Sequence, residues 1–586
     1  MKTKNKTIIE KTFFALLPVQ IVMITVTSLN SIIDGVIASN FVSTTALAAI
    51  ALFLPVLRIL DTVNTIFLGG SQILCGRHIG RNQVQKAVSV YSTDILFIVL
   101  FGLMTSFLCI LFGKPIASLF VNDPTLLSEL SDYIYGFAFG IVPMLLIAQF
   151  TAFLQMERQE KRTYIGMTVL IVLNVSLDIL FVTVLGMGMF GLGLATTVSN
   201  LVFLMILVSY YFTKMPAIRF DRRELNAGEI GNIIRVGFPG AVNQLGQTIR
   251  SILLNMIMLA YVGNEGVSAF GAVYSFGCVY WAVSGGVSTA VRILSSIYVG
   301  EEDRVGLRTI MKTALKKGTL LVCLVAAICI GLSPLFTRIF YGPDAGAVYD
   351  MTLAGFLLFP LTMPFSCICC VFSSYYQCLG RMKAVNILMF FDGLFGVILF
   401  SCLFAPVLGM NGIWLAHIVS GLLPMLVILL YTIRFCKHRP RCFSDLLVLS
   451  DEFGVSESDR LNISVNNMQD VVDLSESVIA FGKEHGIDEH RSMLSGLCIE
   501  EMTGNIIQHG FDGRKDYNID VHVVYKDNGL LIRIKDNCKT FNPTEVQNLL
   551  DPEDLTQGIG LRLVTQAAKT MSYNNCLGIN ILTITL

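Results

Sequence analysis

Residues 164–181 read Tyr-Ile-Gly-Met-Thr-Val-Leu-Ile-Val-Leu-Asn-Val-Ser-Leu-Asp-Ile-Leu-Phe, a mostly apolar run that carries Asn174 and Asp178. These two residues are four positions apart, so on a helix their side chains share one face. The run suits a membrane span of about 20 residues. A carboxylate is costly inside such a span, and this cost makes Asp178 a candidate functional residue.

The sequence after this run is repeated later in the chain. Met189-Phe-Gly-Leu-Gly-Leu-Ala-Thr-Thr-Val-Ser199 returns as Met410-Asn-Gly-Ile-Trp-Leu-Ala-His-Ile-Val-Ser420. The similarity predicts that the apolar part of the chain contains two copies of one unit. Leu399 stands in the second copy where the first has Asp178, so only the first copy carries an acid at this position.

The composition is that of a membrane protein with a soluble end. Hydrophobic residues make up 54% of the 586 residues, and the mean hydropathy is +0.68. Charged residues are scarce before about residue 437 and frequent after it, so the balance of 42 basic and 42 acidic residues averages two unlike regions. The 15 cysteines lie mostly in apolar runs without paired spacing, which favours buried thiols over disulfides or a metal site.

The apolar part contains twelve candidate membrane spans, at 12–38, 46–72, 88–112, 131–156, 164–184, 189–212, 232–260, 266–296, 315–335, 348–376, 384–404 and 412–434. Basic residues precede the first span and follow each even-numbered one, whereas the other loops have almost none. The positive-inside rule therefore places both termini on the cytoplasmic side. We expect the protein to lie in a cytoplasmic (inner) membrane. Six spans per copy give both copies the same orientation, as in transporters with parallel repeats.

These patterns divide the chain into four parts. We expect a first six-helix lobe over 1–213, a second over 214–437, a polar linker over 438–460 and a soluble domain over 461–586. The soluble domain is predicted to contain strand 461–466, helices 468–485 and 488–508, hairpin 518–536, helix 560–572 and strand 579–586. The fold class is therefore an all-α polytopic membrane protein with a C-terminal α+β domain.

Residues 1–437 resemble the multidrug and toxic compound extrusion (MATE) transporters. The resemblance rests on the repeat, on Asp34 followed by an Ala-rich run, and on Asn174 and Asp178 followed by a glycine-rich segment at 186–196. It implies export of organic, often cationic, compounds in exchange for protons or sodium. It also implies that Asp34, Asn174 and Asp178 form the ion site. Some members carry a carboxylate in the second lobe that has no evident counterpart here, so the choice of ion stays open.

Elementary physics gives these residues the same role. Burial favours the neutral form of a carboxylate, and a second acid nearby favours it further in one member of the pair. Such a pair could carry a proton, or with amide and hydroxyl oxygens it could supply the hard ligands that sodium prefers. The alternative is packing through interhelical hydrogen bonds. Two acids without a basic partner in either span favour the functional interpretation.

The C-terminal domain resembles the GHKL ATP-binding fold, and most closely the anti-sigma-factor serine kinases. Three motifs carry the resemblance: Leu497-Cys-Ile-Glu-Glu-Met-Thr-Gly-Asn-Ile-Ile-Gln-His-Gly510, Ile534-Lys-Asp-Asn-Cys-Lys-Thr-Phe541 and Gly558-Ile-Gly-Leu561. The resemblance implies ATP and Mg²⁺ as cofactors. It implies these roles: Glu501 as the catalytic base, Asn505 on Mg²⁺, Asp536 and Thr583 at the adenine, Gly558 and Gly560 at the phosphates. One departure is Cys538, which replaces a glycine usual at this position and puts nucleotide affinity in question.

Together these patterns predict an ion-coupled exporter with a cytosolic ATP-binding regulatory domain. The sequence has no Gly-x-x-x-x-Gly-Lys-Ser/Thr motif, so nucleotide is not expected to drive transport directly. The expected partners are a small organic substrate, membrane lipid and a protein substrate of the kinase-like domain, but no nucleic acid. Whether the domain is an active serine kinase stays open. The alternative function is a membrane-bound signalling kinase that uses a transporter-like receptor.

Overall fold

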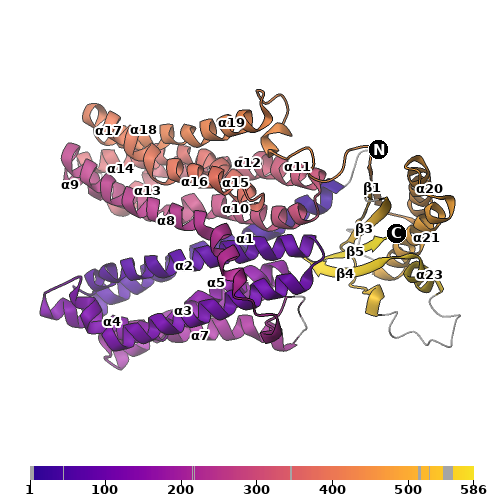
Figure 1. Cartoon of the computed structure of the whole chain (residues 1–586). Coiled ribbons are helices and arrows are strands. Elements are labelled where there is room, and N and C mark those ends of the chain that lie inside the picture. The colour runs from indigo at the N-terminus through magenta and orange to yellow at the C-terminus, as the bar shows by residue number, and fades with distance from the viewer. Residues whose placement is uncertain are drawn as a thin grey trace.

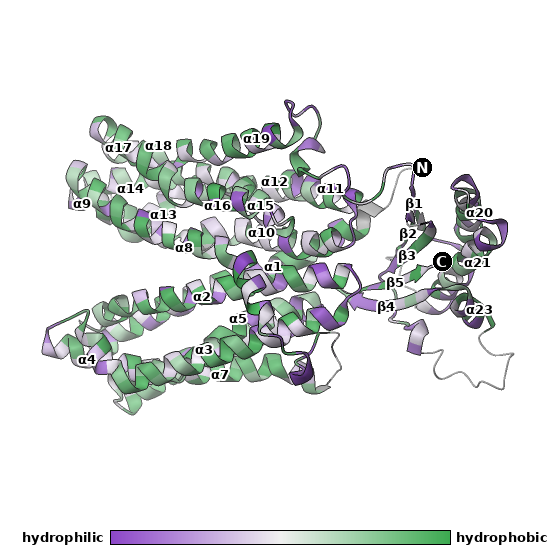
Figure 2. Ribbon diagram, in the orientation of Figure 1, coloured by the Kyte–Doolittle hydropathy of each residue, from purple (hydrophilic) through white to green (hydrophobic). Residues whose placement is uncertain are grey.

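The computed structural model describes residues 5–43, 45–213, 216, 218–342, 346–511, 517–526, 528–545 and 559–586. Two helical lobes lie side by side, and the C-terminal domain lies against one end of both (Figure 1). We call this end of the lobes the docking end. Hydrophobic residues dominate the length of both lobes, whereas hydrophilic residues are more frequent at the docking end and on the C-terminal domain (Figure 2).

The first lobe contains seven helices of the described chain: α1 (Asn5–Ile37), α2 (Ala46–Gly80), α3 (Val84–Ser118), α4 (Pro124–Ala138), α5 (Ile141–Met156), α6 (Glu160–Asp178) and α7 (Gly188–Thr213). Two π-helical turns, η1 (Ala38–Val42) and η2 (Ile179–Val184), extend α1 and α6. Helices α4 and α5 meet at a bend of 50° and together have the length and composition of one broken membrane span.

The second lobe begins after a short 3₁₀ turn, η3 (Arg222–Glu224). Its helices are α8 (Gly228–Tyr261), α9 (Asn264–Ser275), α10 (Gly277–Gly300), α11 (Arg304–Thr313), α12 (Thr319–Gly331), α13 (Ser333–Phe340), α14 (Ala347–Leu358), α15 (Met363–Cys378), α16 (Met382–Phe390), α17 (Gly396–Leu408), α18 (Met410–Ser420) and α19 (Leu422–Cys436). Turns η4 (Ala314–Gly318), η6 (Phe359–Thr362) and η7 (Phe391–Phe395) join α11 to α12, α14 to α15 and α16 to α17.

The described part of the chain has 10 helical segments long and apolar enough to cross a membrane, or up to 11 when α4 and α5 count as one span. Helix α8 is not among them although it has 34 residues, because it carries Asn243, Gln247 and Arg250 within its length. It nevertheless runs through the bundle beside α2 (Figure 1). The predicted all-α polytopic fold is thus confirmed.

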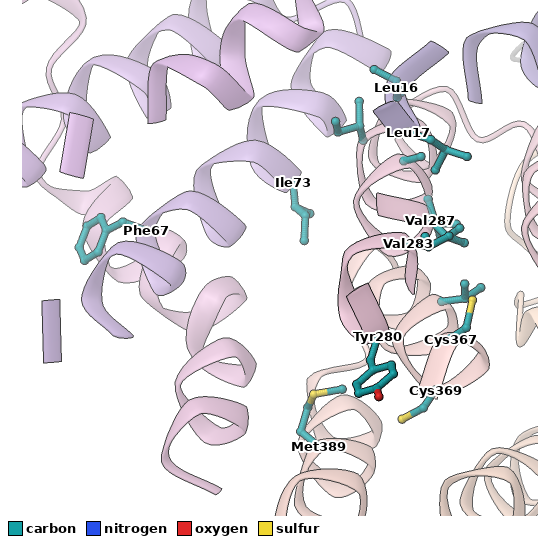
Figure 3. Packing of buried hydrophobic residues seen from close by; sticks show 14 of the residues in the cluster. Leu16, Leu17, Phe67, Ile73, Tyr280, Val283, Val287, Cys367, Cys369 and Met389 are labelled. Carbon is teal, nitrogen blue, oxygen red and sulfur yellow. The ribbon is translucent and has the colours of Figure 1, made fainter. Parts of the chain in front are cut away.

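The two lobes are in close contact at the docking end. Gly76 and Gly80 of α2 lie so close to Ser296 and to the backbone oxygen of Ile297 in α10 that neither glycine has room for a β-carbon. Small residues allow such backbone approach between membrane helices. Nearby, Leu16 and Leu17 of α1 lie beside Val283 and Val287 of α10 (Figure 3). Away from this end the lobes diverge (Figure 1).

Residues 438–460 lie along the second lobe. Leu447 and Val448, at turn η8 (Asp445–Leu447), are buried in the hydrophobic core of the lobes. The hydroxyl of Tyr375 donates to Leu447 O at 3.0 Å, and Arg304 Nη2 donates to Ser450 O at 2.6 Å. The polar segment predicted as a linker is therefore packed against the second lobe over much of its length.

The C-terminal domain is a five-stranded antiparallel sheet in the order β1-β2-β3-β5-β4, with helices on one face. The strands are β1 (Arg460–Val465), β2 (Ile519–Lys526), β3 (Gly529–Asp536), β4 (Thr570–Cys576) and β5 (Ile579–Thr585). The helices are α20 (Met468–Glu484), α21 (Glu489–Asn505) and α23 (Ile559–Ala567), and turn η9 (Ile506–Gly510) follows α21. Apolar residues of the strands and helices form a core separate from that of the lobes.

One predicted element of this domain is wrong. We predicted a helix over 560–572, but α23 ends at Ala567 and residues 570–576 form β4, which pairs along its whole length with β5. The two strands are joined by Leu577 and Gly578, with φ of 56° and 63°. Positive φ at both residues is what a tight two-residue hairpin turn requires. Pairing with β5 therefore overrides the local helical pattern.

Candidate functional site

The structure brings together the three polar residues predicted for the first lobe. Asp34 lies near the end of α1, and Asn174 and Asp178 lie on the last turns of α6. With the Asn174 amide nitrogen turned toward the acids, Nδ2 lies 2.9 Å from Asp34 Oδ1 and 3.1 Å from Asp178 Oδ2. All three side chains are buried. One amide therefore contacts both carboxyl groups.

A fourth residue, Asn30, completes this cluster. Its Nδ2 donates to Asp34 Oδ2 at 3.3 Å, and its Oδ1 lies 2.8 Å from the nitrogen of Asn174. Asp178 Oδ1 is buried without a hydrogen-bond partner, and within the described chain no lysine or arginine is within ion-pair distance of either acid. We call Asn30, Asp34, Asn174 and Asp178 the acid cluster. Its two carboxyl groups contact each other and the amides of Asn30 and Asn174.

The π-helical turn after Asp178 has a counterpart in the second lobe. Turn η7, between α16 and α17, contains Asp392. There Arg250 of α8 donates from Nη1 to the backbone oxygen of Asp392 at 3.3 Å. Turns of this type interrupt helices mostly at functional positions. The two lobes thus differ in charge, since the first has two acids and the second has an acid beside an arginine.

A pocket opens between the sheet and α21 in the C-terminal domain. The lining residues are Met502, Asn505, Ile506, His509, Gly510, Asp536, Lys539, Phe541, Pro543, Tyr573, Asn580 and Leu582. Asp536 is the last residue of β3, and its side chain is buried. Its carboxylate accepts hydrogen bonds from Cys538 N at 2.9 Å and from Asn580 Nδ2 at 2.7 Å. Burial raises the pKa of its carboxyl group. The pocket is therefore apolar with a few convergent polar groups, as ligand sites usually are.

Glu501 and Asn505 lie one turn apart on α21, as the spacing predicts. Asn505 lines the pocket, whereas the Glu501 carboxyl group lies against the first turn of α23. There it leaves no room for a β-carbon on Gly560. Gly558, also predicted at the phosphates, falls outside the described residues. Glu501 thus meets Gly560 at the start of α23, where anions bind readily, and Asn505 lines the pocket one helical turn further along α21.

The comparisons with known proteins assign a family to both parts of the chain. Residues 18–180 and 239–400, together more than half of the chain, match the MatE family. The chain belongs to the MATE family. Residues 466–586 match the histidine kinase-like ATPase domain, so a MATE transporter fold and an ATPase-type domain share one polypeptide.

Individual relatives are similar over the MATE lobes. The probable multidrug resistance protein YoeA of Bacillus subtilis is 23% identical over 324 residues, which cover 53% of this chain and 68% of the relative. The multidrug export protein MepA of Staphylococcus saprophyticus is 22% identical over 425 residues, which cover 69% of this chain and 90% of the relative.

Solved structures resemble the lobes in fold. A MATE crystal structure in complex with MaL6 has a TM-score of 0.67 at 20% identity, covering 73% of this chain and 97% of the other. The outward-facing conformation of a multidrug resistance MATE family transporter has a TM-score of 0.66 at 21% identity, covering 73% of this chain and 96% of the other.

The structure places Thr583 away from the pocket of the ATPase-type domain. Thr583 pairs with Arg533, and its side chain lies on the opposite face of β5 from Asn580 and Leu582, which line the pocket. The neighbour of Asp536 across the sheet is instead Asn580. Sequence reasoning missed Asn580 and Tyr573, whose hydroxyl donates to Asn580 Oδ1 at 2.7 Å. The register of β5 against β3 could have indicated Asn580, whereas Tyr573 lies on β4, for which the sequence pattern predicts no strand.

The side chain of Cys538 does not line the pocket. Its β-carbon packs toward Gly510, at 3.0 Å from the position that a β-carbon on Gly510 would occupy. Its amide and its thiol both contact the Asp536 carboxyl group, and its carbonyl accepts from Asn580 Nδ2 at 3.3 Å. Replacement of the usual glycine by cysteine is therefore accommodated beside the pocket.

Proposed function

We propose that the lobes form an ion-coupled antiporter that exports organic compounds, including cationic ones, across the cytoplasmic membrane. The observation that carries this proposal is the acid cluster, in which Asp34 and Asp178 share Asn174 and have no cationic partner in the described chain. Uncompensated acids within a membrane span are expensive, and such groups mark ion pathways. The multidrug relatives YoeA and MepA support the class of substrate.

The acid cluster exchanges the coupling ion with water on alternate sides of the membrane. A proton added to Asp178 removes the charge that has no hydrogen-bond partner at Oδ1, and the neutral acid can donate to the neighbouring carboxylate. Sodium would instead be held by the oxygens of Asp34 and Asp178 together with the amide oxygens of Asn30 and Asn174. In either case, ion release to the cytoplasm drives the substrate outward. The docking end and both termini then face the cytoplasm, and membrane lipid surrounds the apolar lobes.

For the C-terminal domain we propose ATP binding with Mg²⁺. The pocket suits a nucleotide because Asp536 can accept a hydrogen bond from an adenine amino group at the buried end. Asn505, which also lines the pocket, would hold Mg²⁺. The Gly560 backbone, against which Glu501 lies, would approach the phosphates together with Gly558. Bound ATP supplies a transferable phosphoryl group, and Glu501 would take the proton of an attacking hydroxyl group.

The most specific form of this proposal is a protein serine kinase activity that regulates the transporter. The ATPase-type domain match supports a nucleotide site, and the position of Glu501 beside Gly560 supports a base near the phosphates. The alternative, a signalling kinase with a transporter-like receptor, uses the same residues but does not need the acid cluster. The acid cluster favours the transporter.

Flux in proteoliposomes tests the proposed function. The purified protein is reconstituted, a proton or a sodium gradient is imposed, and export of a fluorescent organic cation is followed with and without ATP. We expect gradient-driven export without ATP. Export that needs ATP and ignores both gradients would contradict the proposal.

A further inference from the structure

The sheet of the C-terminal domain has two different faces, and both are covered. Apolar side chains such as Val521, Ile534 and Leu582 pack against the helices of the domain. The alternate residues point the other way and are mostly polar or charged. On this outer face, Asp520, His522 and Lys535 are nonetheless buried. The lobes cover them at the docking end (Figure 1).

One contact joins the outer face to the second lobe. Lys535 Nζ lies 2.6 Å from Glu301 Oε2, at the end of α10, and the two side chains are only 4% and 2% exposed. Arg533 Nη1 lies 3.8 Å from the same carboxylate, and the ring of Tyr298 lies 4.1 Å below Lys535 Nζ. Removing Lys535 leaves the buried Glu301 carboxylate with the more distant Arg533, and loss of one partner of a buried pair is strongly destabilising.

A second contact joins the sheet to the first lobe. The hairpin turn between β4 and β5 reaches the end of α5, where Leu577 N donates to Met156 O at 2.7 Å. Leu577 and its neighbour Cys576 are buried within the hydrophobic core of the lobes, not that of their own domain. Asn82, in the loop between α2 and α3, hydrogen-bonds Ser572 and Asn574 of β4. The domain thus touches both lobes through different strands.

The lobes also hold each other at this same end. Arg77 of α2 donates from Nε to Cys378 O, at the end of α15, at 2.8 Å. Arg292 of α10 donates from Nε to Gln72 Oε1 of α2 at 2.9 Å. Cys378 is buried beneath these contacts, and its thiol faces Arg292 O at 3.3 Å. The docking end must open if substrate is to enter from that side.

We propose that the C-terminal domain is a clamp that holds the docking ends of the two MATE lobes together. It bridges the lobes through Lys535 on Glu301 and Leu577 on Met156, so the lobes cannot separate at this end while both contacts persist. The direction of its effect rests on the proposed function, in which this end admits substrate from the cytoplasm. A docked domain therefore holds the transporter closed to the cytoplasm, and its release permits reloading.

Native cysteines report the two parts of this proposal separately. Cys576 is buried under the docked domain, Cys378 is buried between the lobes, and Cys442 is exposed. The full-length protein in lipid nanodiscs is treated with a polar maleimide, without nucleotide or ion gradient. Peptide mass spectrometry then gives the alkylation rates of Cys576 and Cys378 relative to Cys442. Because no gradient is present, the result is independent of ion coupling.

We compare wild type with Lys535→Met and, separately, Leu577→Asp, which break the two contacts from different strands. Either variant should raise the labelling rates of both Cys576 and Cys378 by about tenfold or more. Lys535→Met removes the closest cation from the buried Glu301 carboxylate, and Leu577→Asp places a carboxylate in the hydrophobic core of the lobes. The matched control is Lys526→Met, which removes an ion pair with Glu302 whose partners are 51% and 42% exposed. The control should change either rate by less than about twofold.

Two outcomes would overturn the clamp. If Cys576 becomes reactive while Cys378 keeps its wild-type rate, the domain is docked but does not hold the lobes. If neither Lys535→Met nor Leu577→Asp exposes Cys576, these contacts do not hold the domain. If a domain variant folds poorly, Glu301→Gln tests the same contact from the lobe side. This substitution removes the charge of Glu301 and leaves the domain unaltered.

Discussion

Lys535 and Asp536 are neighbours on β3 whose side chains point to opposite faces of the sheet. Lys535 pairs with Glu301 of the second lobe, and Asp536 lines the pocket of the ATPase-type domain. A one-residue step along a strand therefore separates the contact with the transporter from the proposed nucleotide site. Any shift of β3 on nucleotide binding would act directly on the docking contact. No long pathway of side chains is needed to connect the two.

The two residues at the end of α21 should separate catalysis from binding. Glu501→Gln should lower phosphoryl transfer by about 10²–10⁴-fold, because it removes a general base but no ground-state contact. Asn505→Ala should weaken Mg-ATP binding itself. Autophosphorylation or peptide phosphorylation measures the first effect, and calorimetry measures the second. Equal loss of binding in both variants would contradict the assignment of the base.

Gly560→Ala tests the contact between Gly560 and Glu501. A β-carbon at this position has no room unless the Glu501 carboxyl group moves. We therefore expect the substitution to lower phosphoryl transfer nearly as far as Glu501→Gln does. Gly504→Ala is a suitable control, because a β-carbon there meets only the end of Met468 at 3.8 Å. Full activity in Gly560→Ala would show that Glu501 acts from another position.

The isolated domain should fold and bind ATP with Mg²⁺. A fragment over 455–586 retains a core separate from that of the lobes. Within this fragment, Cys538→Gly should change nucleotide affinity by less than about threefold, since the Cys538 side chain lies beside Asp536 and Gly510 but does not line the pocket. Calorimetry on the folded fragment measures both. A large gain of affinity in Cys538→Gly would show that the cysteine obstructs the nucleotide.

Docking of the domain should weaken in acid. The pKa of His522 is lowered to about 3, because burial and the charges of Lys535, Arg533 and Arg460 together outweigh the opposing charge of Asp303. A released histidine has a pKa near 6.5, so the released domain binds more protons below about pH 6.5 and docking weakens as the pH falls. The ratio of Cys576 to Cys442 labelling should therefore rise between about pH 7 and 5. The rise should be smaller in His522→Gln, and an identical rise there would contradict the assignment.

Sequence patterns predicted the acid cluster because a carboxylate in an apolar span is conspicuous. Asp178 and Asn174 share a helical face, and any fold that buries the face must bring partners to them. Asn30 lies four residues before Asp34 on the same helix, yet it remained outside the predicted site. An amide carries no charge, so its presence in a span does not by itself indicate function, and the family resemblance implies Asn174 but not Asn30.

Docking between the domain and the lobes could not be predicted in this way. Alternating polar residues such as Asp520, His522 and Lys535 are typical of a solvent-facing sheet surface, and nothing local reveals that another domain covers it. Strand β4 was missed because its Asn574 and Asn575 have low strand propensity. Without β4, the sequence pattern does not place Leu577 in a turn between two strands. The hairpin that reaches the first lobe could therefore not be recognised.

The acid cluster provides the most direct test of the account. Asp178→Asn preserves the size of the side chain and removes the group that gains and loses charge. Proteoliposomes containing this variant are compared with wild type and with the control Asp132→Asn, which changes an exposed acid of α4 outside the cluster. Gradient-driven export without ATP should be lost in Asp178→Asn and retained in wild type and the control. Unchanged export in both Asp178→Asn and Asp34→Asn would contradict ion coupling at these residues.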